Sequence, residues 1–104
     1  MKPDVQEEYK EYIDANTIHV ILDVEPKDHV IERCFRIFSY YDRKASYEVE
    51  TNTYKLDISY LSFDEGEVIR DILSFGGSVV VLEPRKIQRE VFRRIKMAKD
   101  RYTD

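Results

Sequence analysis

The stretch DILSFGGSVVVLEPRKIQREVFRRI, residues 71–95, decides the fold of this chain. It predicts a helix that ends near Phe75, a turn on two glycines, a strand, a break at Pro84 and a final helix. Gly76 or Gly77 supplies the left-handed residue that commonly closes a helix. The nearly continuous apolar run SVVVLE indicates a buried strand, which suits the middle of a sheet. Proline favours the first position of a helix, so the last helix is expected to open at Pro84 and to bury a stripe of Ile87, Val91, Ile95, Ala98 and Tyr102.

The segment before the glycine pair, SFDEGEVIRDILSF, carries the signals of a helix start. Asp64 and Glu67 have the spacing of a capping box, and Phe63 is placed to pack on Val68 as a hydrophobic staple. The buried stripe of this helix is expected to consist of Val68, Ile69, Ile72 and Leu73, with Phe75 at its end.

A β-hairpin precedes this helix in ASYEVETNTYKLDISYL, residues 45–61. Apolar and polar side chains alternate on both sides of the turn Thr51-Asn52-Thr53, as they do in half-buried strands. The apolar face is expected to carry Tyr47, Val49, Tyr54, Leu56, Ile58 and Tyr60. The other face is charged, so the pattern predicts a sheet that is covered on one side only.

The first strand and helix lie further upstream. TIHVILDV alternates Ile18, Val20, Leu22 and Val24 with His19, Ile21 and Asp23, which is typical of a strand with one strongly apolar face. In DHVIERCFRIFSYY, Asp28 is the expected N-cap and the buried stripe is Val30, Ile31, Cys34, Phe35 and Phe38. Cys34 is therefore interpreted as a small buried apolar residue and not as a nucleophile.

The element order is β-α-β-β-α-β, with one further helix at each end. Two split β-α-β units predict a ferredoxin-like α+β domain, in which a four-stranded antiparallel sheet carries both helices on one face. PDVQEEYKEYIDAN reads as an amphipathic helix outside this pattern. We therefore expect a linker helix over residues 1–16 and the domain over residues 17–104.

Length and composition narrow the class of protein. A chain of 104 residues is expected to form one domain, and it is long enough for one core. Its net charge is −4. Its single cysteine excludes an intramolecular disulfide and a cysteine-based zinc cluster. The sequence shows neither a membrane-spanning stretch nor the apolar segment of a signal peptide. These features predict a cytoplasmic protein without membrane contact.

The residues offer little catalytic or metal-binding chemistry. His19 and His29 lack a third ligand at regular spacing, so no metal site is expected. The central strand YKLDISY lacks the glycine of RNA-recognition strands, and its aromatic residues share a face with Leu56 and Ile58. The acids Asp64, Glu65, Glu67 and Asp71 fit the first turns of a helix better than a pair of catalytic carboxylates. No hydrolase, phosphate-loop or metalloprotease motif occurs, so we predict neither an enzyme nor a cofactor.

Charge is distributed unevenly along the chain. Residues 85–104 carry eight Lys and Arg against three Asp and Glu, whereas residues 1–84 carry nine against eighteen. The tail therefore has a charge of +5 and the body a charge of −9. A basic helix can be a solvated face, or it can dock on an acidic neighbour. For docking, the candidate partner or interdomain surface is Arg85, Lys86, Arg89, Arg93 and Lys96.

The run ISYLSFDEGEVIRDILSFGGSVVVLEPRKIQREVFRRIKMAKDRY, residues 58–102, resembles the C-terminal extension, or WCX domain, of WYL-domain transcriptional regulators. The matching signals are a helix that ends in ILSFGGSV, then VVLEP, then a charged helix that begins RKIQREV. The earlier IHVILDVEPKDHVIERC resembles the strand and helix that open the same extension, and PDVQEEYKEYI resembles the link to the WYL domain.

This resemblance implies a regulatory and dimerisation module of a bacterial transcription factor. In that family a winged helix-turn-helix domain binds DNA, a WYL domain senses an effector, and the ferredoxin-like extension comes last. The chain itself has no helix-turn-helix and no tryptophan, so we expect no direct contact with nucleic acid. The expected partners are N-terminal domains of the same polypeptide, a second copy of the chain and a small-molecule effector. The alternative is a stand-alone module of the same fold that binds a small-molecule effector.

Overall fold

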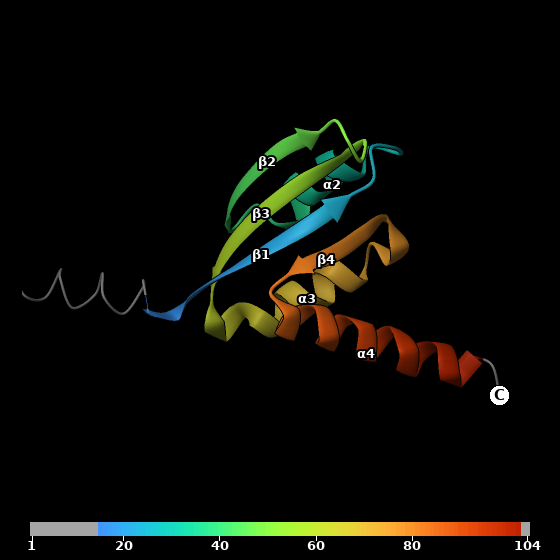
Figure 1. Cartoon of the computed structure of the whole chain (residues 1–104). Helices are drawn as coiled ribbons and strands as arrows, with labels where there is room; N and C mark the ends of the chain where they lie inside the picture. Colours follow the sequence, from blue (N-terminus) through green and yellow to red (C-terminus); the bar gives the residue numbers. More distant parts are fainter. Residues whose placement is uncertain (1–14, 103–104) are drawn as a thin grey trace, which may run out of the picture.

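The computed structural model describes residues 15–102 and shows an α+β domain with one four-stranded sheet (Figure 1). The elements in chain order are β1 (Thr17–Val24), α2 (Val30–Ile37), β2 (Asp42–Glu48), β3 (Thr53–Leu61), a 3-10 turn (Ser62–Asp64), α3 (Glu65–Leu73), a second 3-10 turn (Gly76–Ser78), β4 (Val79–Glu83) and α4 (Arg85–Tyr102). This order confirms the predicted ferredoxin-like arrangement. The linker helix expected over residues 1–16 falls almost entirely outside the described residues.

The strands lie in the order β2-β3-β1-β4, and every neighbouring pair is antiparallel. β1 and β3 occupy the middle, with Val20 opposite Ile58 and Leu22 opposite Leu56. The prediction that SVVVLE forms a middle strand is wrong, because β4 lies at an edge. Val79 and Val81 are buried, whereas Val80 is 49% and Leu82 is 38% exposed, so the apolar run does not mean that both faces of the strand are covered. The helix α4 lies against β4 (Figure 1).

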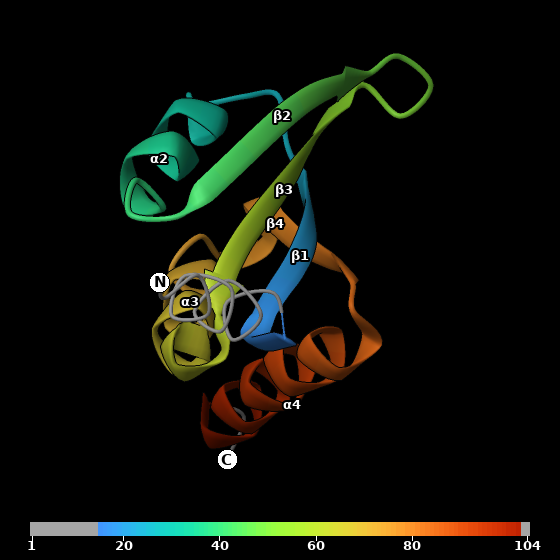
Figure 2. The ribbon, with the colours of Figure 1, turned by 90° about the vertical axis from the view of Figure 1, so that its left-hand side faces the viewer.

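The core lies between one face of the sheet and the helices α2 and α3 (Figure 2). β1 and β3 contribute the predicted alternating residues, α2 contributes Val30 and Cys34, and Phe38 follows directly after α2. Ile31, Phe35 and Tyr54 are partly buried against them. The opposite face of the sheet carries polar pairs such as Asp23 with Lys55. The predicted one-sided covering of the sheet is therefore confirmed.

Two predicted helix caps are wrong. α2 is preceded by His29, which has a φ of 55° and makes no side-chain capping bond, and Asp28 has the same φ. The short loop after β1 turns on these two left-handed residues, a conformation that Asp and His adopt more readily than most residues. Asp64 does precede α3, but its side chain makes no capping bond. The 3-10 turn holds Asp64 at φ −91° and ψ 0°, away from the extended conformation that a capping side chain needs.

Three predicted apolar contacts also differ from the structure. Phe63 is 70% exposed, so the expected staple onto Val68 does not bury it. Val49 lies in the turn after β2 and is 79% exposed, and Tyr47 is exposed as well, although its ring meets that of Tyr54 edge to face at 5.4 Å. The tip of the hairpin extends past α2, so helices no longer cover it (Figure 2).

The final helix is longer than the strand that supports it. Pro84 immediately precedes α4, and its carbonyl accepts hydrogen bonds from the amides of Ile87 and Gln88. Ile87 and Val91 are buried as predicted. Beyond Val91 the predicted apolar stripe of α4 is no longer covered by the domain. β4 has five residues whereas α4 has eighteen, so the helix extends past the strand that supports it (Figure 1). Among the helices of residues 15–102, none combines the length and the apolar character needed to cross a membrane.

Candidate functional site on the last strand and helix

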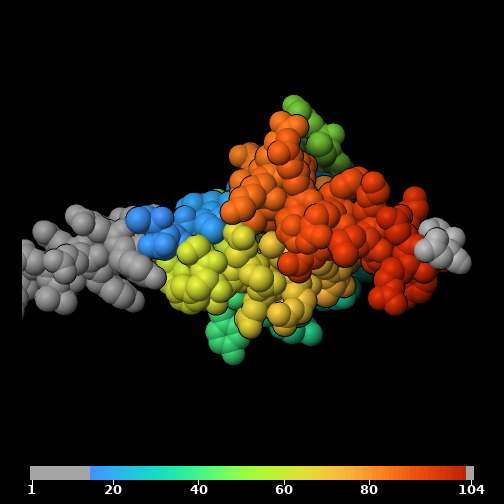
Figure 3. All heavy atoms as spheres, turned by 90° about the horizontal axis from the view of Figure 1, so that it is seen from below, coloured from blue at the N-terminus to red at the C-terminus, as the bar shows by residue number. Residues whose placement is uncertain are grey.

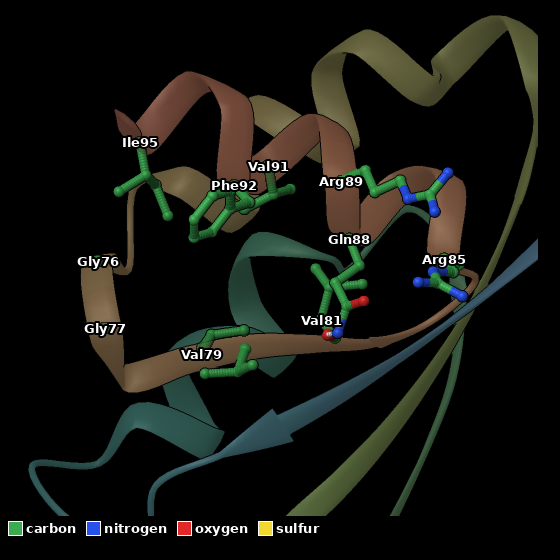
Figure 4. Close-up of a pocket in the computed structure, with 11 residues that line it drawn as sticks. Gly76, Gly77, Val79, Val81, Arg85, Gln88, Arg89, Val91, Phe92 and Ile95 are labelled. Carbon is green, nitrogen blue, oxygen red and sulfur yellow. Dashed lines mark hydrogen bonds between the residues drawn. The ribbon is translucent and has the colours of Figure 1, made fainter. Parts of the chain in front are cut away.

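A groove of about 680 Å³ runs between β4 and α4 (Figure 4). We call it the β4–α4 groove. Its apolar lining consists of Val79, Val80 and Val81 from the strand and Val91, Phe92 and Ile95 from the helix. Gly76 and Gly77 stand at one end, and Arg85 and Arg89 stand at the other (Figure 4). The volume lies within the range of pockets that bind ligands.

The local sequence explains this shape. Gly76 has a φ of +60°, which confirms that one of the two glycines supplies the left-handed residue, and the chain turns there into β4. At the other end Pro84 separates the strand from α4, so the helix folds back beside the strand that it follows. The side-chain amide of Gln88 donates a hydrogen bond to the Val81 carbonyl at 3.1 Å and ties helix to strand.

The backbone of β4 presents a free edge toward this helix. Val80 stands opposite Asp23, and two residues away the Glu25 amide donates to the Ser78 carbonyl at 3.0 Å. In an antiparallel ladder every second pair is hydrogen-bonded, so the Asp23–Val80 pair is bonded like the Glu25–Ser78 pair. Val80 therefore directs its amide and carbonyl toward β1. Val79 and Val81 therefore direct theirs away from β1. The bond from Gln88 to the Val81 carbonyl agrees with this orientation.

The structure divides the predicted basic surface into different environments. All five residues are exposed on α4: Arg85, Lys86, Arg89, Arg93 and Lys96. Arg85 and Arg89 line the β4–α4 groove. Lys86, Arg89 and Arg93 line a second hollow of about 500 Å³ between α4 and the start of α3. The basic residues therefore do not form one continuous patch on a single side of the helix.

Ion pairs further distinguish the arginines. Arg93 and Arg94 both donate hydrogen bonds to Glu90, with shortest distances of 2.7 Å. Hydrogen bonds from Arg93 and Arg94 lower the pKa of the Glu90 carboxyl to about 2, so this carboxylate is charged at neutral pH. Within residues 15–102, neither Arg85 nor Arg89 has a carboxylate within 4.0 Å. The charges of Arg85 and Arg89 are thus available to a partner, as are those of Lys86 and Lys96, whereas that of Arg93 is engaged by Glu90.

Polar networks occupy the open face of the sheet. The Lys55 ammonium and the Thr53 hydroxyl each donate a 2.6 Å hydrogen bond to Asp23. Burial raises the pKa of the Asp23 carboxyl, but these hydrogen bonds outweigh it and lower the pKa below its usual value. His19 lies 3.0 Å from the Ser59 hydroxyl and 3.4 Å from Asp57. These side chains satisfy one another.

The other sequence candidates fall in separate places. His29 pairs with Glu32 at 2.9 Å, away from the network of His19. Within residues 15–102, no three His, Cys, Asp or Glu side chains are grouped as metal ligands.

Burial, followed by the charges of Asp64, Glu67 and Asp71, raises the pKa of the Tyr41 hydroxyl.

Cys34 is buried in the core, as its place in the apolar stripe predicts. Burial raises the pKa of its thiol to about 11, so the thiol is protonated at neutral pH. A buried, protonated thiol is a poor nucleophile. The structure therefore agrees with the interpretation of Cys34 as a small apolar residue.

Sequence reasoning missed several residues of the groove. Phe92 and Gln88 do not belong to the predicted stripe on α4, yet both line the groove. Phe92 follows Val91 directly, and this broadening of the apolar stripe was a usable signal. The free edge of β4 had no signal in the sequence, because SVVVLE was predicted to lie inside the sheet.

Comparison with known proteins adds a family match. The model of the WCX domain matches residues 16–98, which include the whole sheet and most of α4. No curated protein and no solved structure matches the chain significantly. The WCX domain is associated with regulators of the WYL type, which supports a regulatory module in general.

Proposed function

The chain belongs to the WCX domain family, and from this premise we propose that it is the C-terminal regulatory module of a bacterial WYL-type transcriptional regulator. In this proposal the DNA-binding winged helix-turn-helix domain and the WYL sensor domain precede it on the same polypeptide. The module works in the cytoplasm by binding protein surfaces and not by catalysis. Its contribution is to hold two copies of the regulator together, or to hold its own sensor domain in one state.

The observation that carries this proposal is the exposed apolar stripe on the outer half of α4. Ile95 is 48% exposed and Tyr102 is 92% exposed, and Ala98 between them is exposed as well. Figure 3 shows α4 lying beside α3 and then extending past the rest of the body. A helix with an apolar stripe gains most of its stability from packing, so an uncovered half helix favours a partner surface.

The charge distribution favours an acidic partner surface. A tail of +5 and a body of −9 attract each other, whereas two tails repel. The outer half of α4 is therefore proposed to dock on the acidic body of a second copy, or on the sensor domain. Electrostatic attraction between such surfaces weakens as salt is added.

Sedimentation velocity tests the dimer form of this proposal. The chain is expected to associate as its concentration rises, and Tyr102→Ser is expected to weaken that association. Tyr40→Ser is the matched control, because Tyr40 is 93% exposed and lies on the loop after α2. A chain that remains a monomer at millimolar concentration would remove the dimer form and leave only the contact with the sensor domain.

The mass of the native polypeptide tests the regulator assignment itself. Blotting of source cells with an antibody against this domain is expected to show a band about three times larger than the chain, the size of several domains. A band at 12.5 kDa would contradict the assignment and favour the stand-alone effector-binding module.

A further inference from the structure

We propose that the β4–α4 groove binds an extended peptide, which adds as a strand to the free edge of β4 and places a carboxylate at Arg85 and Arg89. This inference goes beyond the regulatory role proposed above. It concerns a groove within one copy of the domain, and it applies whatever domain precedes the chain.

The backbone of β4 supplies the first part of the argument. Val79 and Val81 direct their amide and carbonyl groups away from β1, with the same two-residue spacing that an added strand presents. Of these groups, the Val81 carbonyl accepts the side-chain amide of Gln88, which an incoming backbone amide can replace. Exposed edges are commonly protected by a charge, a proline or a bulge within the strand. In β4 these features lie together at the C-terminal end, where the pairing with β1 is bulged at Leu82 and Glu83 precedes Pro84. Val79–Val81 carries none of them, so this part of the edge remains open to pairing.

The side chains around this edge supply the second part. Val79 and Val81 form one side of the groove, while Phe92 and Ile95 extend over it from α4 (Figure 4). Val80 also lines the groove although its side chain belongs to the open face, so the groove reaches the strand backbone itself. Alternate side chains of an added strand would enter the groove, and the apolar lining selects apolar residues at those positions.

The arginines supply the third part and give the peptide its charge. Arg85 and Arg89 are four residues apart on α4, so they lie on the same side of the helix. Both stand at the end of the groove where β4 meets the helix (Figure 4). Arg93 and Arg94 are engaged by Glu90, whereas the described residues supply no carboxylate to Arg85 or Arg89. A guanidinium pair without a partner is suited to a carboxylate, from an Asp or Glu side chain or from a peptide C-terminus.

A second copy of the chain is the competing occupant. Its own β4 could pair antiparallel with this edge, but Glu83 of that strand would then lie near the Gly76 and Gly77 end of the groove and not at the arginines. An acidic, alternately apolar peptide satisfies the backbone edge, the groove and the arginines together, so the observations favour it.

Selection from a phage-displayed library of random twelve-residue peptides, against the whole chain, tests the proposal. Enriched peptides are expected to alternate apolar residues and to carry an acid at one constant end. A synthesised winner is expected to shift the amide resonances of Val79 and Val81. N-methylation at the peptide residues that face β4 is expected to abolish binding, whereas N-methylation at the intervening residues is expected to be tolerated, because only the first set bonds to the strand.

Charge reversal separates this site from unspecific binding to a basic helix. The double variant Arg85→Glu and Arg89→Glu is expected to weaken binding at least about tenfold, since it replaces attraction with repulsion. Arg101→Glu on the same helix is the control and should leave the affinity unchanged. A selection without enrichment, or winners insensitive to both N-methylation and charge reversal, would overturn the proposal. Concentration-dependent shifts of the β4 amides without peptide would identify the second copy as occupant and would also overturn it.

Discussion

Replacement of Gly76 by alanine isolates the energetic cost of the turn that leads into β4. Gly76 has a φ of +60°, and a Cβ atom added there would meet no atom within 4 Å. Crowding is therefore absent, and the backbone conformation alone sets the penalty. A left-handed residue other than glycine costs about 1–2 kcal/mol. Alanine also restricts the conformations of the unfolded chain, which stabilises the folded state by about 0.4–1 kcal/mol.

Gly77→Ala is a matched control one residue away. A Cβ atom at Gly77 also meets nothing within 4 Å, but its φ lies outside the left-handed range. In both variants alanine restricts the unfolded chain to the same extent, which stabilises the folded state equally. The difference between their unfolding free energies should therefore equal the left-handed penalty of about 1–2 kcal/mol. For a domain of this size each kcal/mol corresponds to roughly 4–8 °C in Tm.

Urea denaturation and calorimetry of the two variants measure this difference. Gly76→Ala is expected to be less stable than the wild type, and Gly77→Ala is expected to be equally or more stable. Gly76→Asn should lie between glycine and alanine, because asparagine tolerates the left-handed region. Equal stability of the two alanine variants would refute the reasoning, since it would mean that the φ of residue 76 carries no cost.

Three further predictions test the core and the open face. Leu22→Ala should lower the unfolding free energy by about 2–5 kcal/mol because Leu22 is fully buried, whereas Leu82→Ala on the edge strand should cost far less; urea titration compares them. Tyr60→Phe should stabilise the domain by about 1 kcal/mol in the same assay, because the buried Tyr60 hydroxyl has no hydrogen-bond partner within residues 15–102, and a loss of stability would reveal a hidden partner. Asp23→Asn should be less stable than the wild type at neutral pH, with the gap closing in a pH titration as the pH falls below about 4, because a lowered folded-state pKa stabilises the fold only while the carboxyl is ionised. A gap that persists at pH 2 would assign the loss to packing instead of charge.

The middle of the sheet was predictable because burial on one face is recorded in the sequence. Val20, Leu22 and Val24 recur at every second position, and so do Leu56 and Ile58, which gave both strands and their buried face correctly. The helices α2 and α3 follow from a period of three or four residues for the same reason.

The periphery was less predictable because each error involves an element whose surroundings lie far away in the chain. An apolar run such as Val79–Leu82 is typical of a strand covered on both faces, yet Val80 and Leu82 are exposed and β4 lies at an edge beside α4. No local pattern records these neighbours. The stripe on α4 keeps its period after the sheet has ended, so Ile95 and Tyr102 look like core residues in the sequence. The left-handed pair at Asp28 and His29 is set by the reversal of the chain between β1 and α2.

The candidate site shows the same division. Arg85 and Arg89 were predicted as partner residues from charge, and they line the groove. Whether those residues bind a partner stays a prediction. The sequence could not separate them from Arg93, because the ion pairs with Glu90 depend on side-chain directions along the helix.

The position of β1 between β3 and β4 determines the order in which the chain can close during synthesis. β1 leaves the ribosome first, yet one of its two partners is the last strand to emerge. A sheet of β1, β2 and β3 that formed before the release of Val79–Glu83 would have β1 as its border, with an unpaired backbone open to other nascent chains. Translation speed through the second half of the message thus sets how long this border stays unprotected, and slow codons after α3 should increase the dependence of the domain on chaperones.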